Sequence, residues 1–240
     1  MNQNSRNSFT PTPHQLKGIN HGPYPLMILA GAGTGKTTTL LLRIINMVKN
    51  LDVNPKHILT ITYTEKAAEE LTRRLINNLG YQIRTSTICT FHSFCYRIIQ
   101  DYGDFKNRSN LIEESEAVYL ILIHLNDMGS FYSEEISMNP QKALMIAMGF
   151  ISRCRDELLS PDQLKINTLD DEILSKEHIS QLKDIKNIYK YYQKIKSKFG
   201  LIDYGDMIDN AAHLLKEKPK ILYRIQQNSK HIIIDEFQDN

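Results

Sequence analysis

Residues 30–38 combine glycines with a lysine and threonines in a pattern suited to holding phosphate. The three glycines of this loop allow backbone angles closed to other residues, so successive N–H groups can point into one concavity. Lys36 would reach the β- and γ-phosphates of a nucleotide, and the Thr37 hydroxyl would hold Mg²⁺. A structural strand-to-helix turn is the alternative. The candidate nucleotide-binding residues of the loop are Ala30, Gly31, Ala32, Gly33, Thr34, Gly35, Lys36, Thr37 and Thr38.

A second group of candidate catalytic residues stands near residue 240. The three isoleucines at 232–234 predict a buried strand that delivers Asp235 and Glu236 at its carboxyl end, the edge where ligands bind in open α/β sheets. Asp235 would hold Mg²⁺ directly or through water. Glu236 would polarise the attacking water as general base. A capped strand end without a ligand is the alternative.

Gln15 lies 21 residues before Lys36 (36 − 15) and has two interpretations. Thr12 suits a helix N-cap, Pro13 the first helical position, and Gln15 the third position of a capping box. The side-chain amide also carries donor and acceptor groups that could read the edge of an adenine. The spacing alone leaves both interpretations open.

The elements that must position these residues alternate between strands and helices. A continuous apolar run at 26–30 predicts a strand before the phosphate loop, and the pattern after the loop predicts a helix to about residue 49. Further strands are predicted at 57–63 and 85–90, each followed by a helix, at 64–80 and from residue 91. Strands that alternate with helices indicate a parallel, doubly wound sheet.

Residues 110–200 have almost wholly helical patterns. Helices are predicted at 111–125, 141–158 and 175–199, and further helices at 203–215 and 220–227. The helix at 175–199 carries seven lysines against two acidic residues, a net charge of +5 (7 − 2). These lysines predict either a solvated helix face or a face that contacts phosphates.

A long separation between the two candidate groups predicts an insertion. Lys36 and Asp235 are 199 residues apart (235 − 36), far more than the βα units between them require. We therefore expect a helical insertion between two strands of the sheet. The predicted division is a disordered N-terminus (1–11), a first sheet segment (12–102), a helical subdomain (103–199) and a second sheet segment (200–240).

Composition indicates an ordinary globular protein and excludes several classes. The formal net charge of +2 excludes a uniformly polybasic nucleic-acid binder, so any such role needs local patches. Three cysteines without Cys-x-x-Cys spacing predict reduced thiols rather than a zinc site or disulfides. No apolar stretch approaches the roughly 20 residues that span a bilayer, and residues 1–8 lack a signal-peptide core. The expected location is the cytoplasm.

Four motifs, in order, resemble those of UvrD/Rep/PcrA-type superfamily 1 DNA helicases. They are Ala-Gly-Ala-Gly-Thr-Gly-Lys-Thr (30–37), Thr-Tyr-Thr-Glu-Lys-Ala-Ala (62–68), Thr-Phe-His-Ser (90–93) and Asp-Glu-Phe-Gln-Asp (235–239). Gln15 matches the upstream glutamine motif of that family, and the match covers the chain from about Thr12 onward. The resemblance implies a P-loop RecA-like doubly wound parallel sheet with an inserted all-α subdomain before the Asp-Glu motif.

The resemblance also implies a role for each matching residue. Gln15 would contact adenine, the loop would bind phosphates and metal, and Gln238 would couple the nucleotide state to neighbouring motifs. The segments that line the single-stranded DNA path correspond to Tyr63, Thr64, Lys66, Thr90, Phe91 and His92. Aromatic rings can stack bases for about 1–3 kcal/mol, and hydroxyls and lysine can hold phosphates. Core packing is the alternative for the two aromatic residues, and a structural histidine for His92.

Two residues depart from the family's pattern. Glu65 stands where the family often has asparagine, which places a negative charge beside the proposed phosphate path. Thr38 stands where close relatives often carry arginine, so cation stacking on adenine is missing there.

The activity that the resemblance implies is an ATP- and Mg²⁺-dependent DNA helicase, moving 3′ to 5′ on single-stranded DNA and at single-strand/duplex junctions in repair or replication. In that family a second RecA-like domain supplies transition-state arginines, and an arginine finger contributes roughly 10³–10⁵ in rate. We expect these 240 residues alone to bind nucleotide weakly, hydrolyse it barely and not unwind DNA without that domain or a partner chain supplying it. The alternatives are a non-catalytic nucleotide- and DNA-binding module and an unrelated phosphate-loop switch protein.

Overall fold

The computed structural model describes residues 10–31, 33–103, 110–166 and 175–239. Contacts divide the chain into two compact units, one of Met1–Phe94 with Lys218–Asn240 and one of Cys95–Glu217. We call them the sheet unit and the helical unit. The helical unit is wider at both ends than the insertion predicted at 103–199, whose boundaries stay a prediction. The predicted disorder at 1–11 falls almost entirely on residues outside the described ranges.

The sheet unit is built on a parallel sheet, which confirms the mixed α/β fold class. Its strands are β1 (Ile58–Thr62), β2 (Thr87–Thr90) and β5 (His231–Ile234), in the order β2-β1-β5. β1 pairs in parallel with both neighbours, with Leu59 opposite Thr87 on one side and Ile58 opposite His231 on the other. The strands predicted at 57–63 and 85–90 are therefore present, with slightly shorter bounds.

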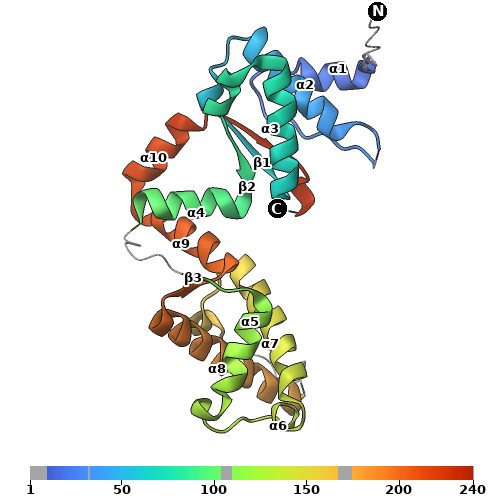
Figure 1. Ribbon diagram of the computed structural model, residues 1–240. Coiled ribbons are helices and arrows are strands. Elements are labelled where there is room, and N and C mark those ends of the chain that lie inside the picture. The colour runs from blue at the N-terminus through green and yellow to red at the C-terminus, as the bar shows by residue number, and fades with distance from the viewer. Residues whose placement is uncertain (1–9, 32, 104–109, 167–174, 240) are drawn as a thin grey trace, which may run out of the picture. The chain divides into compact units, whose positions relative to one another are not determined.

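Two of the helices of the sheet unit, α2 (Lys36–Lys49) and α3 (Glu65–Leu79), pack against one face of this sheet. Further helices are α1 (Pro13–Ile19) and α10 (Pro219–Asn228), with 3₁₀ turns at Pro55–His57, Tyr81–Thr85 and Phe237–Asp239. The apolar faces of α2 and α3 meet β1 in one core, where Ile44, Leu75 and Ile58 are at most 1% exposed. Figure 1 shows α3 lying across β1 and β2. This core holds α2 and α3, whose first turns contain Lys36 and Lys66 of the predicted site.

Two expectations about apolar runs are wrong. The run at 26–30 is not a strand, and all five of its side chains are exposed. Ile28 instead lies against α1, where its Cδ1 atom would be 3.2 Å from a Cβ built on Gly18. The strand β5 is not fully buried either, because Ile232 is 60% and Ile234 40% exposed, and only Ile233 packs, partly buried, against the core of α2 and α3. Among the described residues β5 is the edge strand of the sheet, and no other strand pairs with its outer edge.

The described part of the helical unit contains a helical bundle and a short parallel ladder. The elements are β3 (Asn110–Leu111), α5 (Glu114–Ile123), α6 (Glu134–Met138), α7 (Pro140–Asp156), α8 (Lys176–Phe199), β4 (Leu201–Ile202), α9 (Tyr204–Glu217) and 3₁₀ turns at Leu125–Met128 and Pro161–Gln163. α4 (Phe91–Tyr102) begins in the sheet unit and continues into this one. Ile121 of α5, Leu144 of α7 and Ile188 of α8 are fully buried in one core (Figure 1). No helix in the described part of the chain is long and apolar enough to cross a bilayer.

Several lysines of α8 contact the protein itself. Lys186 donates to the Leu164 carbonyl at 2.6 Å, and Lys190 pairs with Asp162 at 2.6 Å. Lys196 is 2% exposed. Neither a solvated face nor a phosphate-contacting face therefore accounts for all the lysines of this helix, because some of them bind groups of the protein.

Lys196 belongs to a buried charge cluster at the start of α9, which also contains Arg155, Asp203, Asp206 and Asp209. Arg155 contacts Asp203 at 2.5 Å and Asp206 at 2.6 Å, and Lys196 contacts the same two carboxylates at 2.7 and 2.8 Å. Each of these aspartates also accepts the backbone N–H of the other at 2.9 Å, which forms a capping box for α9. The cluster thus ties the ends of α7 and α8 to the first turn of α9.

The charge balance of this cluster predicts a pH dependence of stability. Burial opposes ionisation of Asp203, but Lys196 and Arg155 outweigh it and hold the pKa of Asp203 well below its usual value. A carboxylate with a lowered pKa stabilises the folded state above its unfolded pKa of about 3.9, and that stability is lost as the pH falls through the folded pKa.

We expect Asp203→Asn to lower the unfolding free energy at pH 7 by about 3–5 kcal/mol, because it leaves two buried cations under-compensated. The difference from the wild-type chain should narrow below about pH 4. Urea denaturation across this pH range measures both effects. Asp156→Asn, at an exposed position at the end of α7, is the control. An equal loss of stability in the two variants would contradict the prediction.

Candidate functional site

The carboxyl ends of the three strands meet at one edge of the sheet. Thr62, at the end of β1, lies opposite Thr90, at the end of β2, and Ile61 lies opposite Ile234. The Asp235 N–H donates to the Ile61 carbonyl at 2.9 Å, so the ladder continues one residue beyond β5. The segments that follow β1, β2 and β5 therefore leave the sheet on the side where ligands bind in α/β proteins.

The phosphate loop has the backbone geometry that its glycines predict. Gly33 (φ 74°) and Gly35 (φ 86°) adopt left-handed conformations that other residues rarely adopt. Gly35 is also the N-cap of α2 and provides no capping side chain. The unpaired N–H groups of the first turn and the positive end of the helix dipole are therefore available to an anion at the loop. Ala32 lies outside the described residues.

Gln15 connects the phosphate loop to α1. Its Oε1 atom accepts the Thr12 N–H at 2.8 Å, which completes the predicted capping box. Its Nε2 atom donates to the Thr34 carbonyl at 3.0 Å, and the Thr34 hydroxyl donates to the Gly31 carbonyl at 2.7 Å. Gln15 therefore caps a helix and also restrains the loop. Its contact with adenine stays a prediction.

An ion pair closes the site across 200 residues of sequence. Lys36 Nζ lies 3.2 Å from Glu236 Oε2, and the Gln238 amide donates to the same oxygen at 2.5 Å. The hydrogen bonds from Gln238 and Lys36 lower the pKa of Glu236, so this carboxylate is ionised at neutral pH. Glu236 has a φ of 50°, an uncommon conformation for a residue with a side chain, which is found most often at functional sites.

Asp235 and Thr37 carry two hard oxygen atoms that could hold a metal ion. Burial, and then the charge of Glu236, raise the pKa of Asp235, while the Glu236 N–H, Lys36 and a hydrogen bond from the Thr37 side chain oppose that rise. Mg²⁺ in nucleotide sites takes one or two protein oxygens together with phosphate oxygens. The donor set brought together here therefore fits the predicted metal. Thr38 is half-buried in the first turn of α2, and Ala30 is exposed before the loop.

The residues predicted to line a DNA path lie at and after the carboxyl ends of β1 and β2, and we call this group, together with Glu65 and Ser93, the strip. Tyr63 is 60% and Phe91 38% exposed, which favours stacking over the alternative of core packing. Lys66 is also exposed, in the first turn of α3. Two rings and one cation are therefore available to a ligand at the ends of β1 and β2.

The other predicted residues are less available to a ligand, or have another contact. Thr64 caps α3 by accepting the Ala67 N–H at 3.1 Å. Thr90 is only 8% exposed, and His92 is half-buried. Their predicted contacts with DNA stay predictions.

Glu65 and Ser93 are two residues of the strip whose role the sequence did not reveal. The Ser93 hydroxyl donates to Glu65 Oε1 at 2.5 Å, and the Thr90 hydroxyl donates to the same atom at 2.7 Å. The Ser93 N–H in turn donates to the Thr90 hydroxyl oxygen at 3.2 Å. The three-residue spacing of Thr90 and Ser93 is typical of a helix cap and was the available signal.

Comparison with known proteins gives a family match over nearly the whole chain. The family described as UvrD/REP helicase N-terminal domain matches residues 11–240. A probable DNA helicase II homolog of Rickettsia felis is 33% identical over 240 residues, which cover 96% of this chain and 33% of that protein. The ATP-dependent DNA helicase PcrA of Staphylococcus epidermidis is 31% identical, covering 94% of this chain and 29% of its own length. The ATP-dependent DNA helicase UvrD1 of Mycobacterium tuberculosis is 27% identical, covering 95% and 28%. The chain thus spans about a third of the length of the curated relatives that it matches.

Lys36→Ala tests the loop. We expect the variant to lose binding of a fluorescent ATP analogue, because the loop lacks the cation that would reach the β- and γ-phosphates. Its melting temperature should change little, since the Lys36 and Glu236 side chains are about a third exposed (31% and 34%) and exposed ion pairs contribute little to stability. Lys49→Ala, at the far end of α2, is the control. Unchanged binding by Lys36→Ala would refute the assignment.

Proposed function

The chain belongs to the UvrD/REP helicase family, in its N-terminal domain, and from this we propose that it is the ATP-binding portion of an ATP-dependent DNA helicase. The whole protein would couple ATP hydrolysis to 3′ to 5′ movement on single-stranded DNA, in DNA repair or replication. The observation that carries the proposal is the Lys36–Glu236 contact, which brings the phosphate loop to the acidic pair from 200 residues away. A strand-to-helix turn and an isolated strand end would have no reason to meet.

The residues of the site suit the binding of ATP and Mg²⁺. The N–H groups of the loop and of the first turn of α2 would hold the phosphates, and Thr37 and Asp235 would hold the metal. Mg²⁺, when bound, neutralises charge that develops on the phosphates. Lys36 has one ammonium group to share, so its move toward the phosphates weakens its pairing with Glu236. The ionised Glu236 can then accept a proton from water as general base.

A second candidate is a module that binds nucleotide and DNA without hydrolysis. The closed Lys36–Glu236 pair favours it, because the general base is already held by two donors in this structure. In the family, a second RecA-like domain or a partner chain supplying it would complete the nucleotide cleft. The two candidates differ in turnover, which a variant of the base can measure.

Glu236→Gln is expected to bind ATP as the wild-type chain does and to hydrolyse none, because an amide cannot take the proton from water. Hydrolysis is measured with and without single-stranded DNA, for the 240-residue chain alone and mixed with a separately produced second domain of the family. We expect slow turnover alone and recovered turnover in the mixture, with Glu70→Gln on α3 as control. Turnover retained by Glu236→Gln would refute its role, and no turnover by any mixture favours the module.

The exposed strip at the ends of β1 and β2 suits single-stranded DNA, including the single strand at a junction with duplex. Tyr63 and Phe91 offer faces on which bases can stack, and Lys66 offers a cation for a phosphate. A phosphate-loop switch protein would have no use for such a strip. The proposal of a DNA path rests on these three exposed side chains.

Two variants separate stacking from charge in this path. Tyr63→Ala should weaken binding of an oligothymidine by about 1–3 kcal/mol at every salt concentration. Lys66→Ala should weaken it mainly at low salt and make the slope of log K against log salt shallower by about 0.7. Tyr81→Ala is the control. This tyrosine is 72% exposed, but it precedes β2 and so lies toward the amino end of that strand, away from the proposed path. Equal affinity of the wild-type chain for heparin and for DNA would instead favour a phosphate-loop switch protein.

A further inference from the structure

Glu65 connects the two segments of the proposed DNA path. It is the first residue of α3, directly after β1, and its carboxylate reaches the segment that follows β2. One oxygen, Oε1, accepts both the Thr90 hydroxyl at 2.7 Å and the Ser93 hydroxyl at 2.5 Å. The carboxylate therefore takes up the hydroxyl donors at the start of α4.

The contact with Glu65 leaves neither hydroxyl with a hydrogen to donate to a phosphate. A hydroxyl group has one hydrogen to donate. Thr90 is 8% exposed, gives its hydrogen to Glu65, and uses its oxygen to accept the Ser93 N–H at 3.2 Å. The Ser93 hydroxyl is half-buried and is also committed to Glu65. A phosphate could be held by these hydroxyls only after the carboxylate has moved away.

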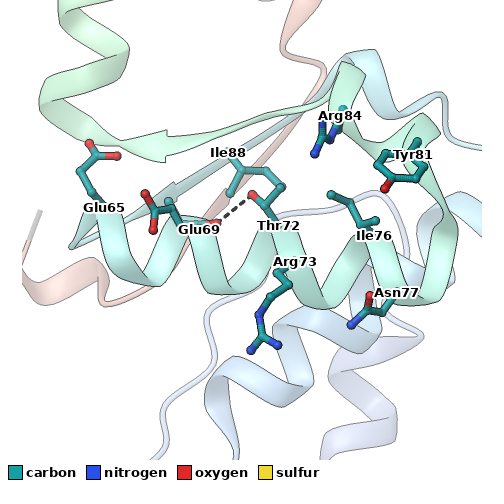
Figure 2. A pocket seen from close by; sticks show the side chains of 10 residues that line it. Glu65, Glu69, Thr72, Arg73, Ile76, Asn77, Tyr81, Arg84 and Ile88 are labelled. Atoms are coloured by element: carbon teal, nitrogen blue, oxygen red, sulfur yellow. Dashed lines mark hydrogen bonds between the residues drawn. The ribbon is translucent and has the colours of Figure 1, made fainter.

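The charge of Glu65 acts in the same direction. Phosphate and carboxylate are both anions and accept the same hydrogen bonds, so they exclude each other from one pair of donors. Glu65 itself is exposed, which leaves its side chain free to turn toward solvent without unpacking the core. Figure 2 shows Glu65 and Glu69 projecting from the first turns of α3. Glu69 is also exposed, and no hydrogen bond joins it to either hydroxyl among the described contacts.

We propose that Glu65 is an internal competitor of the DNA backbone, which occupies the Thr90–Ser93 hydroxyl pair in the free protein and gives it up to a phosphate when DNA binds. The inference rests on the proposed function, since it assigns the residue that sets the affinity of that same path. Glu65 makes this part of the path weak for phosphates and leaves stacking on Tyr63 and Phe91 as its main source of affinity. It is an affinity-determining residue of the DNA path.

Three variants separate competition from a bracing role. Glu65→Ala removes both the acceptor and the charge, whereas Glu65→Gln removes the charge and keeps an oxygen that can accept both hydroxyls. Glu69→Gln removes the same charge one turn later on α3 and is the matched control. The probe is a labelled oligothymidine of about 15 nucleotides, a length within reach of one single-strand site. Binding is measured by fluorescence anisotropy at several salt concentrations.

Glu65→Ala is expected to bind the oligothymidine about tenfold more tightly than the wild-type chain at low salt. The slope of log K against log salt should change only as much as it does in Glu69→Gln, because neutral hydroxyls hold a phosphate without releasing its counterions. Glu65→Gln should gain less, and Glu69→Gln should change affinity less than about twofold. Adding Ser93→Ala to Glu65→Ala should remove most of the gain, since the freed hydroxyl is the new phosphate ligand.

The opposite results overturn the proposal. If Glu65→Ala binds no more tightly than Glu69→Gln, the carboxylate is only a brace or a part of the net charge. If the Ser93→Ala double variant keeps the full gain, the hydroxyls are not the ligands. Binding by the wild-type chain in the same assay tests the proposed function separately. If the wild-type chain binds and Glu65→Ala binds no more tightly, only the proposed competition is refuted. If no chain binds the oligothymidine, the competition and the proposed DNA path are both refuted. Thermal unfolding confirms that each variant is folded. If Glu65→Ala does not fold, the gain in affinity is tested with Glu65→Gln.

Discussion

The parallel pairing of β1 with β5 is the constraint on which the site depends. Ile58 and His231 lie opposite each other although 173 residues separate them (231 − 58). This register places Asp235 beside Ile61 and brings Glu236 to Lys36 at the start of α2. A shift of one residue would turn every side chain of β5 to the other face of the sheet and remove the acidic pair from the loop. The chemistry of two distant motifs thus rests on a ladder of four residue pairs.

Local signals in the sequence predicted the elements well, and long-range partners could not be predicted from it. The bounds of α2, α3 and α8 follow from caps and periodicity, and the capping box of Thr12 and Gln15 is present as expected. The apolar run at 26–30 and the isoleucines of β5 show the limit, because an apolar pattern indicates burial without saying which element covers it. Arg155 and Lys196 show the same limit for charge. Nothing near Arg155 in the sequence reveals that its three carboxylate partners begin 48 residues later (203 − 155).

One edge of the sheet handles anions in two different ways. At the phosphate loop, the anion of the chain, Glu236, pairs with Lys36 and the N-cap Gly35 has no capping side chain, so the backbone N–H groups of the first turn of α2 are left to a ligand. At the strip, the chain supplies its own anion, because Glu65 satisfies the hydroxyls that follow β2. The difference arises from a single residue at the first position of α3. Electrostatics at this edge is therefore set residue by residue and does not follow from the formal net charge of +2.

The position of the helical unit between β2 and β5 also orders events during synthesis. At about 5–20 residues per second, the ribosome needs on the order of 10–30 s to make the residues between β1 and β5. During that interval β1 and β2 can pair and the contiguous helical unit can fold, but the other edge of β1 has no strand to receive. An unpaired edge of five buried-type residues is a template for pairing with other chains. The same insertion that separates the two halves of the site therefore leaves this edge of β1 unpaired in the nascent chain until β5 emerges.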